Sequence, residues 1–121
     1  MDTVILVEED LIGTGLPTLW MRGIPFFNKN DALKFIDYCI NKNIFILGIE
    51  GFKIENRYRT PDMEFIGDFS AIYAAGSSYK EKIGESAEAA HKFVSMPATY
   101  DIMFEFILCQ ENDANALVCR C

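Results

Sequence analysis

The stretch Ile44-Phe45-Ile46-Leu47-Gly48-Ile49 is an unbroken apolar run near the middle of the 121-residue chain. A run of six residues that contains three isoleucines favours a β-strand buried on both faces. We therefore expect it at the centre of a sheet. The glycines at positions 48 and 51 lie on either side of Ile49-Glu50, and they predict a bend or a bulge in this strand.

The residues from Asn28 to Asn43 predict a helix directly before this strand. Asn28 or Asn30 can cap its start, where Asp31 also suits the helix dipole. Asn43 suits the left-handed position that follows a helix end. The apolar residues recur at spacings of three and four and predict one buried face: Ala32, Leu33, Phe35, Ile36, Cys39 and Ile40.

The residues after the apolar run predict a hairpin. Phe52, Ile54 and Tyr58 alternate with polar residues, and the chain is expected to turn near Glu55-Asn56. Thr60-Pro61-Asp62 is predicted to end the second strand as a turn. Residues 63–72 are mainly apolar with acids at 64 and 68, and they predict either a strand or an irregular covering segment.

A second helix is expected to begin at Ser78, which forms a capping-box sequence with Glu81. Pro97 is expected to stop it. The closing strand, residues 102–108, has a large apolar residue at every even position, so one of its faces is expected in the core. The second helix also has an apolar stripe that consists of Tyr79, Ile83, Ala87, Ala90 and Val94.

The N-terminal part adds short extended segments. Leu19-Trp20-Met21 is β-prone and ends at Arg22-Gly23, and Pro25 biases the residue before it toward extended geometry. Residues 4–12 allow either a strand or a short helix. Together these elements predict a single α+β domain over residues 1–121. We expect an antiparallel or mixed sheet of about four to five strands, with two main helices packed on one face.

The formal net charge is −7 and is uneven, since residues 1–61 carry −1 and residues 62–121 carry −6. Such a chain is expected to repel nucleic acid and anionic membranes and to attract a basic partner. An acidic surface that serves only solubility explains the charge alone equally well. The chain also has no secretory signal and no stretch long enough to span a bilayer, so we expect a cytoplasmic protein.

Groups suited to catalysis are few. His91 is the one histidine in the sequence, and a surface position suits it better than a pairing with Cys109 or Ser70. Gly13-Thr14-Gly15 lacks the lysine and the further glycine of a phosphate-binding loop, so it is expected to be a turn. We therefore expect no enzyme activity and no cofactor.

Metal-ligating residues are also sparse. Cys39 and Cys109 lie in apolar segments and predict buried thiols. Cys119-Arg120-Cys121 resembles half of a zinc site, without two further ligands. Neighbouring carboxylates could hold a hard cation or serve hydrolysis, although an acidic surface explains them better: Asp62, Glu64 and Asp68. We expect no metal.

Three stretches follow one another along the chain: Arg22-Gly23-Ile24-Pro25-Phe26-Phe27, a predicted helix containing Asp31-Ala32-Leu33, and Ile46-Leu47-Gly48-Ile49-Glu50-Gly51-Phe52. A final strand with Phe104-Glu105-Phe106 follows. Over roughly residues 20–110, this pattern resembles the immunity protein 40 family of bacterial toxin–immunity systems, which include contact-dependent growth inhibition. The family favours Gly-Gly-Asp where Gly48-Ile49-Glu50 stands. The resemblance implies a small intracellular protein that binds and neutralises a cognate toxin domain.

An inhibitor of a basic, nuclease-type toxin benefits from an acidic face and from large apolar anchors. Phe65 and Phe69 suit the core better than such a surface. The acidic residues from Glu81 to Glu88 are a second candidate surface. The first candidates for partner binding are Glu50, Tyr58, Asp62, Glu64, Asp68 and Tyr73.

Two other classes of function remain open. A small-molecule or peptide-sensing domain would use a cleft between the helices and the sheet. A structural subunit of a larger assembly would need an exposed apolar patch. The sequence leaves open the identity of the toxin, the binding face and the oligomeric state.

Overall fold

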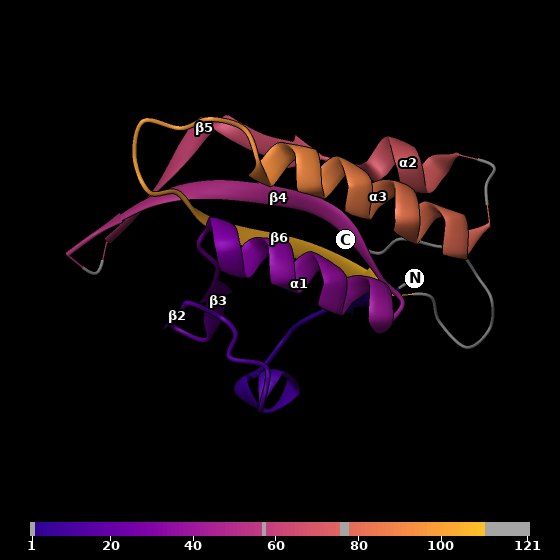
Figure 1. The fold of residues 1–121 in the computed structure, drawn as a ribbon, viewed down its shortest axis with the longest axis horizontal. Coiled ribbons are helices and arrows are strands. Elements are labelled where there is room, and N and C mark those ends of the chain that lie inside the picture. Colours follow the sequence, from indigo (N-terminus) through magenta and orange to yellow (C-terminus); the bar gives the residue numbers. More distant parts are fainter. Residues whose placement is uncertain (1, 57, 76–77, 111–121) are drawn as a thin grey trace.

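The computed structural model describes residues 2–56, 58–75 and 78–110, which form an α+β fold. Its main sheet is antiparallel, with the strand order β1 (Asp2–Val4), β6 (Met103–Gln110), β4 (Ile44–Glu55) and β5 (Tyr58–Asp68) (Figure 1). A separate antiparallel hairpin consists of β2 (Leu19–Met21) and β3 (Ile24–Phe26). The predicted α+β class is confirmed, and no parallel pair of strands occurs in the described ranges.

The helices are α1 (Lys29–Asn41), the short α2 (Ser70–Ala74) and α3 (Tyr79–Val94). A 3₁₀ helix, η1 (Glu8–Leu11), precedes β2. The two alternatives for residues 4–12 therefore both hold in part, because β1 ends at Val4 and η1 begins four residues later. The α2 helix was not predicted.

The apolar run at residues 44–49 lies in β4, which pairs with β6 on one side and with β5 on the other. Its predicted central place in the sheet is confirmed. The pairing register shifts between Ile46 and Gly48 toward β6, and between Glu50 and Phe52 toward β5. One bend or bulge was predicted at Ile49-Glu50, and the strand instead has two irregularities, one on each side of these residues. Each one resets which face of the sheet the following side chains reach.

The two long helices, α1 and α3, pack side by side on one face of the sheet, as predicted (Figure 1). Asn28 caps α1, where its side-chain oxygen accepts a hydrogen bond from the Asp31 N–H at 2.8 Å. Asn43 has a φ of 57°, as expected for the residue that closes a helix. The prediction for Ile40 was wrong, since this residue is 41% exposed near the end of α1.

The α3 helix begins as predicted, because the Ser78 hydroxyl oxygen accepts a hydrogen bond from the Glu81 N–H. Four residues of the predicted stripe are buried: Ile83, Ala87, Ala90 and Val94. Phe35 of α1 stacks on Phe27 and meets the ring of Phe106 edge-on, with centroids 4.9 Å apart in the second pair. These aromatic contacts join α1 to the sheet.

The prediction of a turn at Thr60-Pro61-Asp62 was wrong, because these residues continue β5. Proline is tolerated here because, among the described strands, β5 is an edge strand of the sheet and pairs only with β4. Phe52 pairs with Pro61 and Glu50 pairs with Ile66, so residues 62–65 lie opposite Gly51 alone. We call residues 62–65 the β5 bulge.

The face of the sheet that points away from α1 and α3 is called the outer face below. Ile49 is fully buried against the helices, so its neighbour Glu50 points to the outer face. Residues directly opposite each other on antiparallel strands share a face. The outer face therefore includes Glu50, Phe52, Arg59, Ile66, Glu105 and Ile107.

Candidate functional site

The six predicted partner-binding residues do not form one surface. Asp62 and Glu64 lie together in the β5 bulge, beside the loop that follows α3. Asp68 ends β5 at the opposite end of the strand, next to α2, and Tyr73 lies in α2 itself (Figure 1). The remaining two are also apart, since Glu50 is on the outer face and Tyr58 begins β5 at the hairpin tip.

A hollow of about 450 Å³ lies between the β5 bulge and the loop after α3, and we call it the edge hollow. The chain brings these segments together because Phe65 of the bulge is buried in the core, which holds its neighbours against the loop. The lining residues are Asp62, Glu64, Phe65, Met96, Pro97, Ala98, Thr99 and Tyr100.

Asp62 is fixed in place within the edge hollow. The Tyr100 hydroxyl donates a hydrogen bond to Asp62 Oδ2, and the Glu64 N–H donates one to Asp62 Oδ1 at 2.9 Å. These two bonds, that from Tyr100 above all, hold the pKa of Asp62 below its ordinary value. Loss of solvation, followed by the bond to the Asp62 carboxylate, raises the pKa of Tyr100 to about 12. At neutral pH the pair is therefore an anion held by a neutral phenol.

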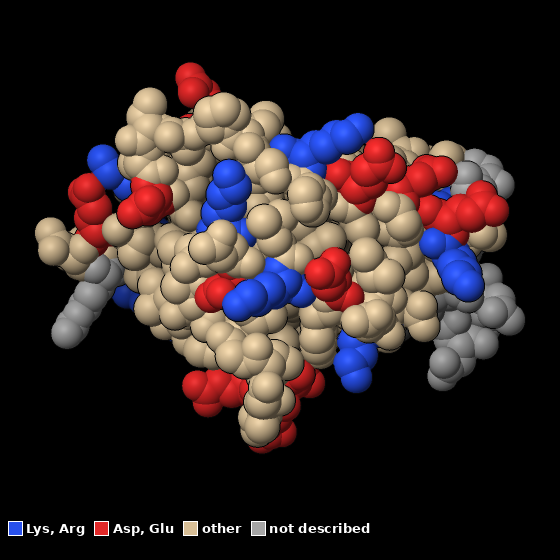
Figure 2. All heavy atoms as spheres, in the orientation of Figure 1, with Lys and Arg blue, Asp and Glu red and all other residues tan. Residues whose placement is uncertain are grey.

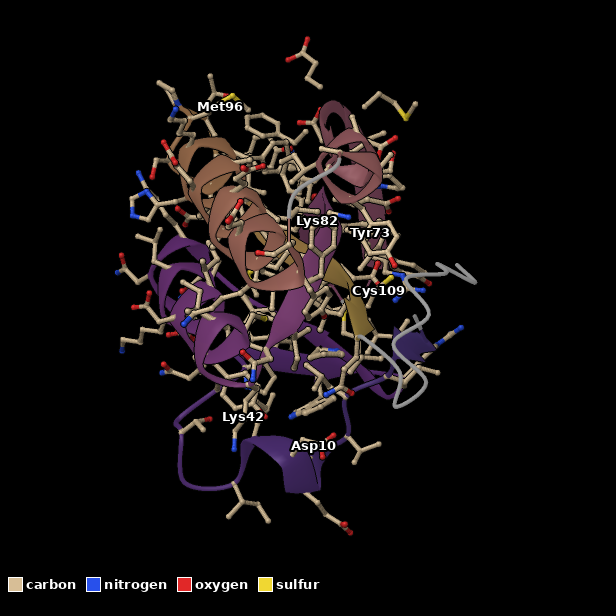
Figure 3. The ribbon with its side chains drawn as sticks, turned by 90° about the vertical axis from the view of Figure 1, so that its right-hand side faces the viewer. Asp10, Lys42, Tyr73, Lys82, Met96 and Cys109 are labelled. Carbon is tan, nitrogen blue, oxygen red and sulfur yellow. The ribbon has the colours of Figure 1, made fainter. Side chains whose placement is uncertain are left out.

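Two methionines near the edge hollow are exposed. Met96 belongs to its lining (Figure 3), and Met63, which is 78% exposed, lies between the two acids in the sequence without lining the hollow. The sequence predictions missed Met63, Met96 and Tyr100. No local pattern marks Tyr100, because it meets Asp62 across 38 positions of the chain.

Asp68 and Tyr73 contribute to the structure at the other end of β5. The Ser70 N–H donates a hydrogen bond to Asp68 Oδ1 at 2.9 Å, which orders the start of α2. Hydrogen bonds from the Ser70 side chain and backbone lower the pKa of Asp68. The Tyr73 ring packs edge-on against Phe45, and Lys82 Nζ lies 5.0 Å from its centroid (Figure 3). Tyr73 is thus partly buried and is no exposed anchor.

Phe65 and Phe69 pack in the core rather than on the surface, as the sequence favoured. Phe65 is buried, and Phe69 is partly buried and packs edge-on against Phe93, with 6.4 Å between the centroids. Tyr58, by contrast, is 78% exposed. Of the aromatic residues in this segment, Tyr58 remains available to a partner.

Glu50 lies near the middle of β4 rather than at a strand end. Its cross-strand neighbours are Ile66 on β5 and Glu105 on β6. Burial, then the charge of Glu50, raise the pKa of Glu105, whereas Arg59 acts in the opposite direction. Two carboxylates therefore stand side by side on the outer face.

Groups for catalysis and metal binding are dispersed. His91 and Ser70 are both exposed, and Gly13-Thr14-Gly15 forms a turn. Within residues 2–56, 58–75 and 78–110, no group of three His, Cys, Asp or Glu side chains is placed to hold a metal ion. Cys39 and Cys109 are buried as predicted, and burial raises the pKa of the Cys39 thiol. The Cys119-Arg120-Cys121 motif lies outside the described residues.

Acidic side chains occur in several separate groups over the helix-covered face, with lysines and arginines between them (Figure 2). The excess of acid therefore does not form one continuous patch on this face. In the described part of the chain, none of the helices combines the length and the apolar character needed to cross a bilayer.

Comparisons with protein-family models, with curated proteins and with solved structures find no match to this chain.

Proposed function

We propose that this chain is a cytoplasmic immunity protein that binds a basic bacterial toxin domain and neutralises it without catalysis of its own. The observation that carries the proposal is the edge hollow, which two acids and the exposed Met96 line, with the exposed Met63 between the two acids in the sequence. The resemblance over residues 20–110 agrees with this class. The net charge of −7 favours a basic partner.

The two acids of the edge hollow differ in a way that suits binding. Asp62 is held by Tyr100 and by the Glu64 N–H, so it presents its charge in a fixed position. Glu64 is exposed on the rim. A fixed negative charge beside an exposed one attracts a cationic surface at long range and orients it on contact.

The methionines supply the apolar part of the surface. Met63 and Met96 are unbranched and polarisable, so they adapt to the shape of a partner. Tyr58 on the same strand adds an exposed ring. Aromatic and methionine side chains are enriched in protein interfaces.

The same segment also protects the sheet edge. A bulge, a proline and charged side chains on an edge strand prevent pairing with the strand of another molecule. A test must therefore separate loss of toxin binding from self-association of the variants.

The test requires a toxin domain encoded directly beside this chain in its genome, and the absence of such a gene would count against the proposal. Cells that express the toxin are expected to grow when they also make the wild-type chain, and to grow more slowly when they make the same amount of Asp62→Asn/Glu64→Gln. The matched control, Glu85→Gln/Glu88→Gln, removes the same charge from the exposed side of α3 and should still protect. Gel filtration checks that each variant has the oligomeric state of the wild type. Lack of protection by the wild-type chain would overturn the proposal. Protection by Asp62→Asn/Glu64→Gln equal to that of the wild type would show that the edge hollow does not bind the toxin.

A second candidate function rests on a larger hollow of about 710 Å³ between the start of α1 and the segment after α3. Thr18, Asn28 and Lys29 supply polar groups, and Val94 and Phe104 supply an apolar part. This volume is in the range of about 300–1,000 Å³ that is typical of small-molecule sites. A ligand screen by thermal unfolding distinguishes this sensing function, because a ligand that binds the folded chain raises its unfolding temperature.

A further inference from the structure

The outer face of the sheet carries exposed apolar side chains in its centre. Ile66 on β5 is 47% exposed and Ile107 on β6 is 36% exposed, although both lie on strands that flank the central strand β4. The two long helices cover the opposite face. Between these isoleucines lies Glu50, whose cross-strand neighbour on β6 is Glu105.

The Glu50–Glu105 pair lies on the outer face near Arg59, whose charge acts to lower the pKa of Glu105. Like charges directly opposite each other on neighbouring strands repel. The Arg59 guanidinium, however, lies over the Phe26 ring, 5.5 Å from the centroid. The ion pairs found among the described residues include neither glutamate. Both carboxylates can therefore accept hydrogen bonds from a further cation.

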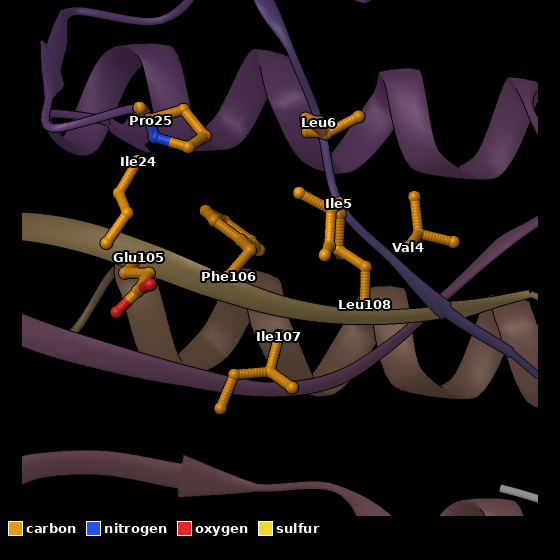
Figure 4. Close-up of a pocket in the computed structure, with 10 residues that line it drawn as sticks. Val4, Ile5, Leu6, Ile24, Pro25, Glu105, Phe106, Ile107 and Leu108 are labelled. Atoms are coloured by element: carbon orange, nitrogen blue, oxygen red, sulfur yellow. The ribbon is translucent and has the colours of Figure 1, made fainter. Parts of the chain in front are cut away.

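An apolar hollow of about 330 Å³ is lined in part by Glu105 of this pair (Figure 4). It opens at the edge of β6, because β1 pairs only with Leu108–Gln110 and Phe27 bridges to Phe104. Ile107 points to the opposite side of β6 from Phe106, so the hollow extends around the strand edge toward the outer face (Figure 4). Glu105 and Ile107 belong to its lining, together with Ile5 and Ile24.

We propose that the outer face docks a protein segment in which an arginine follows a large aliphatic residue. The guanidinium binds between Glu50 and Glu105, and the aliphatic side chain enters the hollow beside Ile107. Arginine suits this place better than lysine, because its planar fork of donors reaches two carboxylates at once and its weakly hydrated faces pack on Ile66. The apolar hollow supplies the anchor and the acidic pair supplies the specificity.

This proposal is independent of the proposed function, since it concerns another face of the sheet and its test needs no toxin. The probe is N-acetyl-leucyl-arginine amide, titrated into the ¹⁵N,¹³C-labelled full chain and followed by NMR. The matched control peptide contains citrulline in place of arginine, which keeps the shape and removes the charge. We expect saturable shifts at Glu50, Ile66, Glu105 and Ile107 with the arginine peptide in the millimolar range, and none with the citrulline peptide.

Two variants locate the effect. Glu50→Gln/Glu105→Gln should weaken binding of the arginine peptide by about tenfold. Glu85→Gln/Glu88→Gln removes the same charge from the exposed side of α3 and should leave the affinity unchanged. The amide spectrum of each variant shows whether it is folded. The proposal fails if Glu50→Gln/Glu105→Gln binds as well as the wild type, if the shifts spread over all acidic surfaces, or if N-acetyl-arginine amide binds as tightly as the leucyl peptide.

Discussion

Gly51 of β4 and Phe65 of β5 approach so closely that a Cβ at position 51 would lie 2.6 Å from the Cβ of Phe65. A γ-carbon of Ile102 would lie 3.1 Å from the same added atom. The β5 bulge places Phe65 over this glycine, and Phe65 in turn is buried against the helices. The close approach thus couples the bulge, and with it the edge hollow, to the core.

Replacing this glycine by alanine should destabilise the fold. We expect Gly51→Ala to lower the free energy of unfolding by about 1–3 kcal/mol, because Phe65 or the backbone of β5 must move. Gly84→Ala is the matched control, since an added Cβ there meets no atom within 4 Å and α3 gains a better helix former. The control should raise stability by up to about 1 kcal/mol. Urea unfolding measures both, and equal effects of the two substitutions would contradict the packing described.

Removing the hydroxyl of Tyr100 should change the titration of Asp62. The hydrogen bond from Tyr100 lowers the pKa of Asp62. The bond therefore stabilises the fold at pH values above 3.8, the ordinary pKa of aspartate, and this stabilisation is lost as the pH falls through the lowered pKa. Tyr100→Phe is therefore expected to raise the pKa of Asp62 and to lower stability at pH 7, with the difference closing in acid. NMR titration of the Asp62 carboxyl carbon measures the shift, and Asp68 serves as the internal control. Unchanged titration of Asp62 would show that the bond does not form in solution.

Glu105 should have the opposite dependence on pH. Burial and Glu50 raise its pKa in the folded state, with Arg59 opposing them, so ionisation destabilises the fold as the pH rises above the ordinary glutamate value of 4.5. We expect Glu105→Gln to be more stable than the wild type at pH 7 by about 0.5 kcal/mol, and equally stable near pH 4. Glu85→Gln corrects for the change in net charge. A less stable Glu105→Gln at pH 7 would mean that Glu105 has a favourable partner in the folded chain.

The two ends of β5 should contribute unequally to toxin binding. Asp62→Asn/Glu64→Gln should slow association with a basic toxin about fivefold at low salt, and the effect should fade as salt screens the charges. Asp68→Asn should change the rate much less, because Asp68 lies next to α2 and away from the edge hollow. Stopped-flow association at two ionic strengths checks both. An Asp68→Asn effect as large as that of the pair would move the binding surface toward α2.

The local pattern of apolar, capping and turn residues predicted most of the fold. The apolar run at 44–49 and the cap at Ser78 each depend on neighbours in sequence, and both were correct. Of the two candidate caps for α1, Asn28 and Asn30, the structure uses Asn28. Pro61 misled the prediction of β5, because a proline that breaks a central strand is harmless on an edge strand. Whether a strand lies at the edge or in the centre of a sheet depends on the order of all its strands, so the local sequence could not predict it.

The candidate site was harder to predict for the same reason. Asp62, Glu64 and Asp68 are neighbours in sequence, yet the extended strand separates Asp68 from the other two. The side on which Glu50 lies depends on the register shift after Ile46, which reverses the alternation of β4. Tyr100 reaches Asp62 through the fold alone. The sequence shows which residues have side chains suited to a binding site, and the strand register determines which of these side chains lie close together.

The place of β6 in the sheet has a consequence for biosynthesis. β6 is the last strand described, yet it lies between the first strand, β1, and the central strand, β4. During translation, β6 emerges about fifty residues after β4. Until then, the backbone groups of β4 on the side that later pairs with β6 have no partner strand in the nascent chain. The sheet closes only when residue 110 has left the ribosome. A prematurely terminated chain would thus expose the apolar strand β4 and give a target for chaperones and proteases.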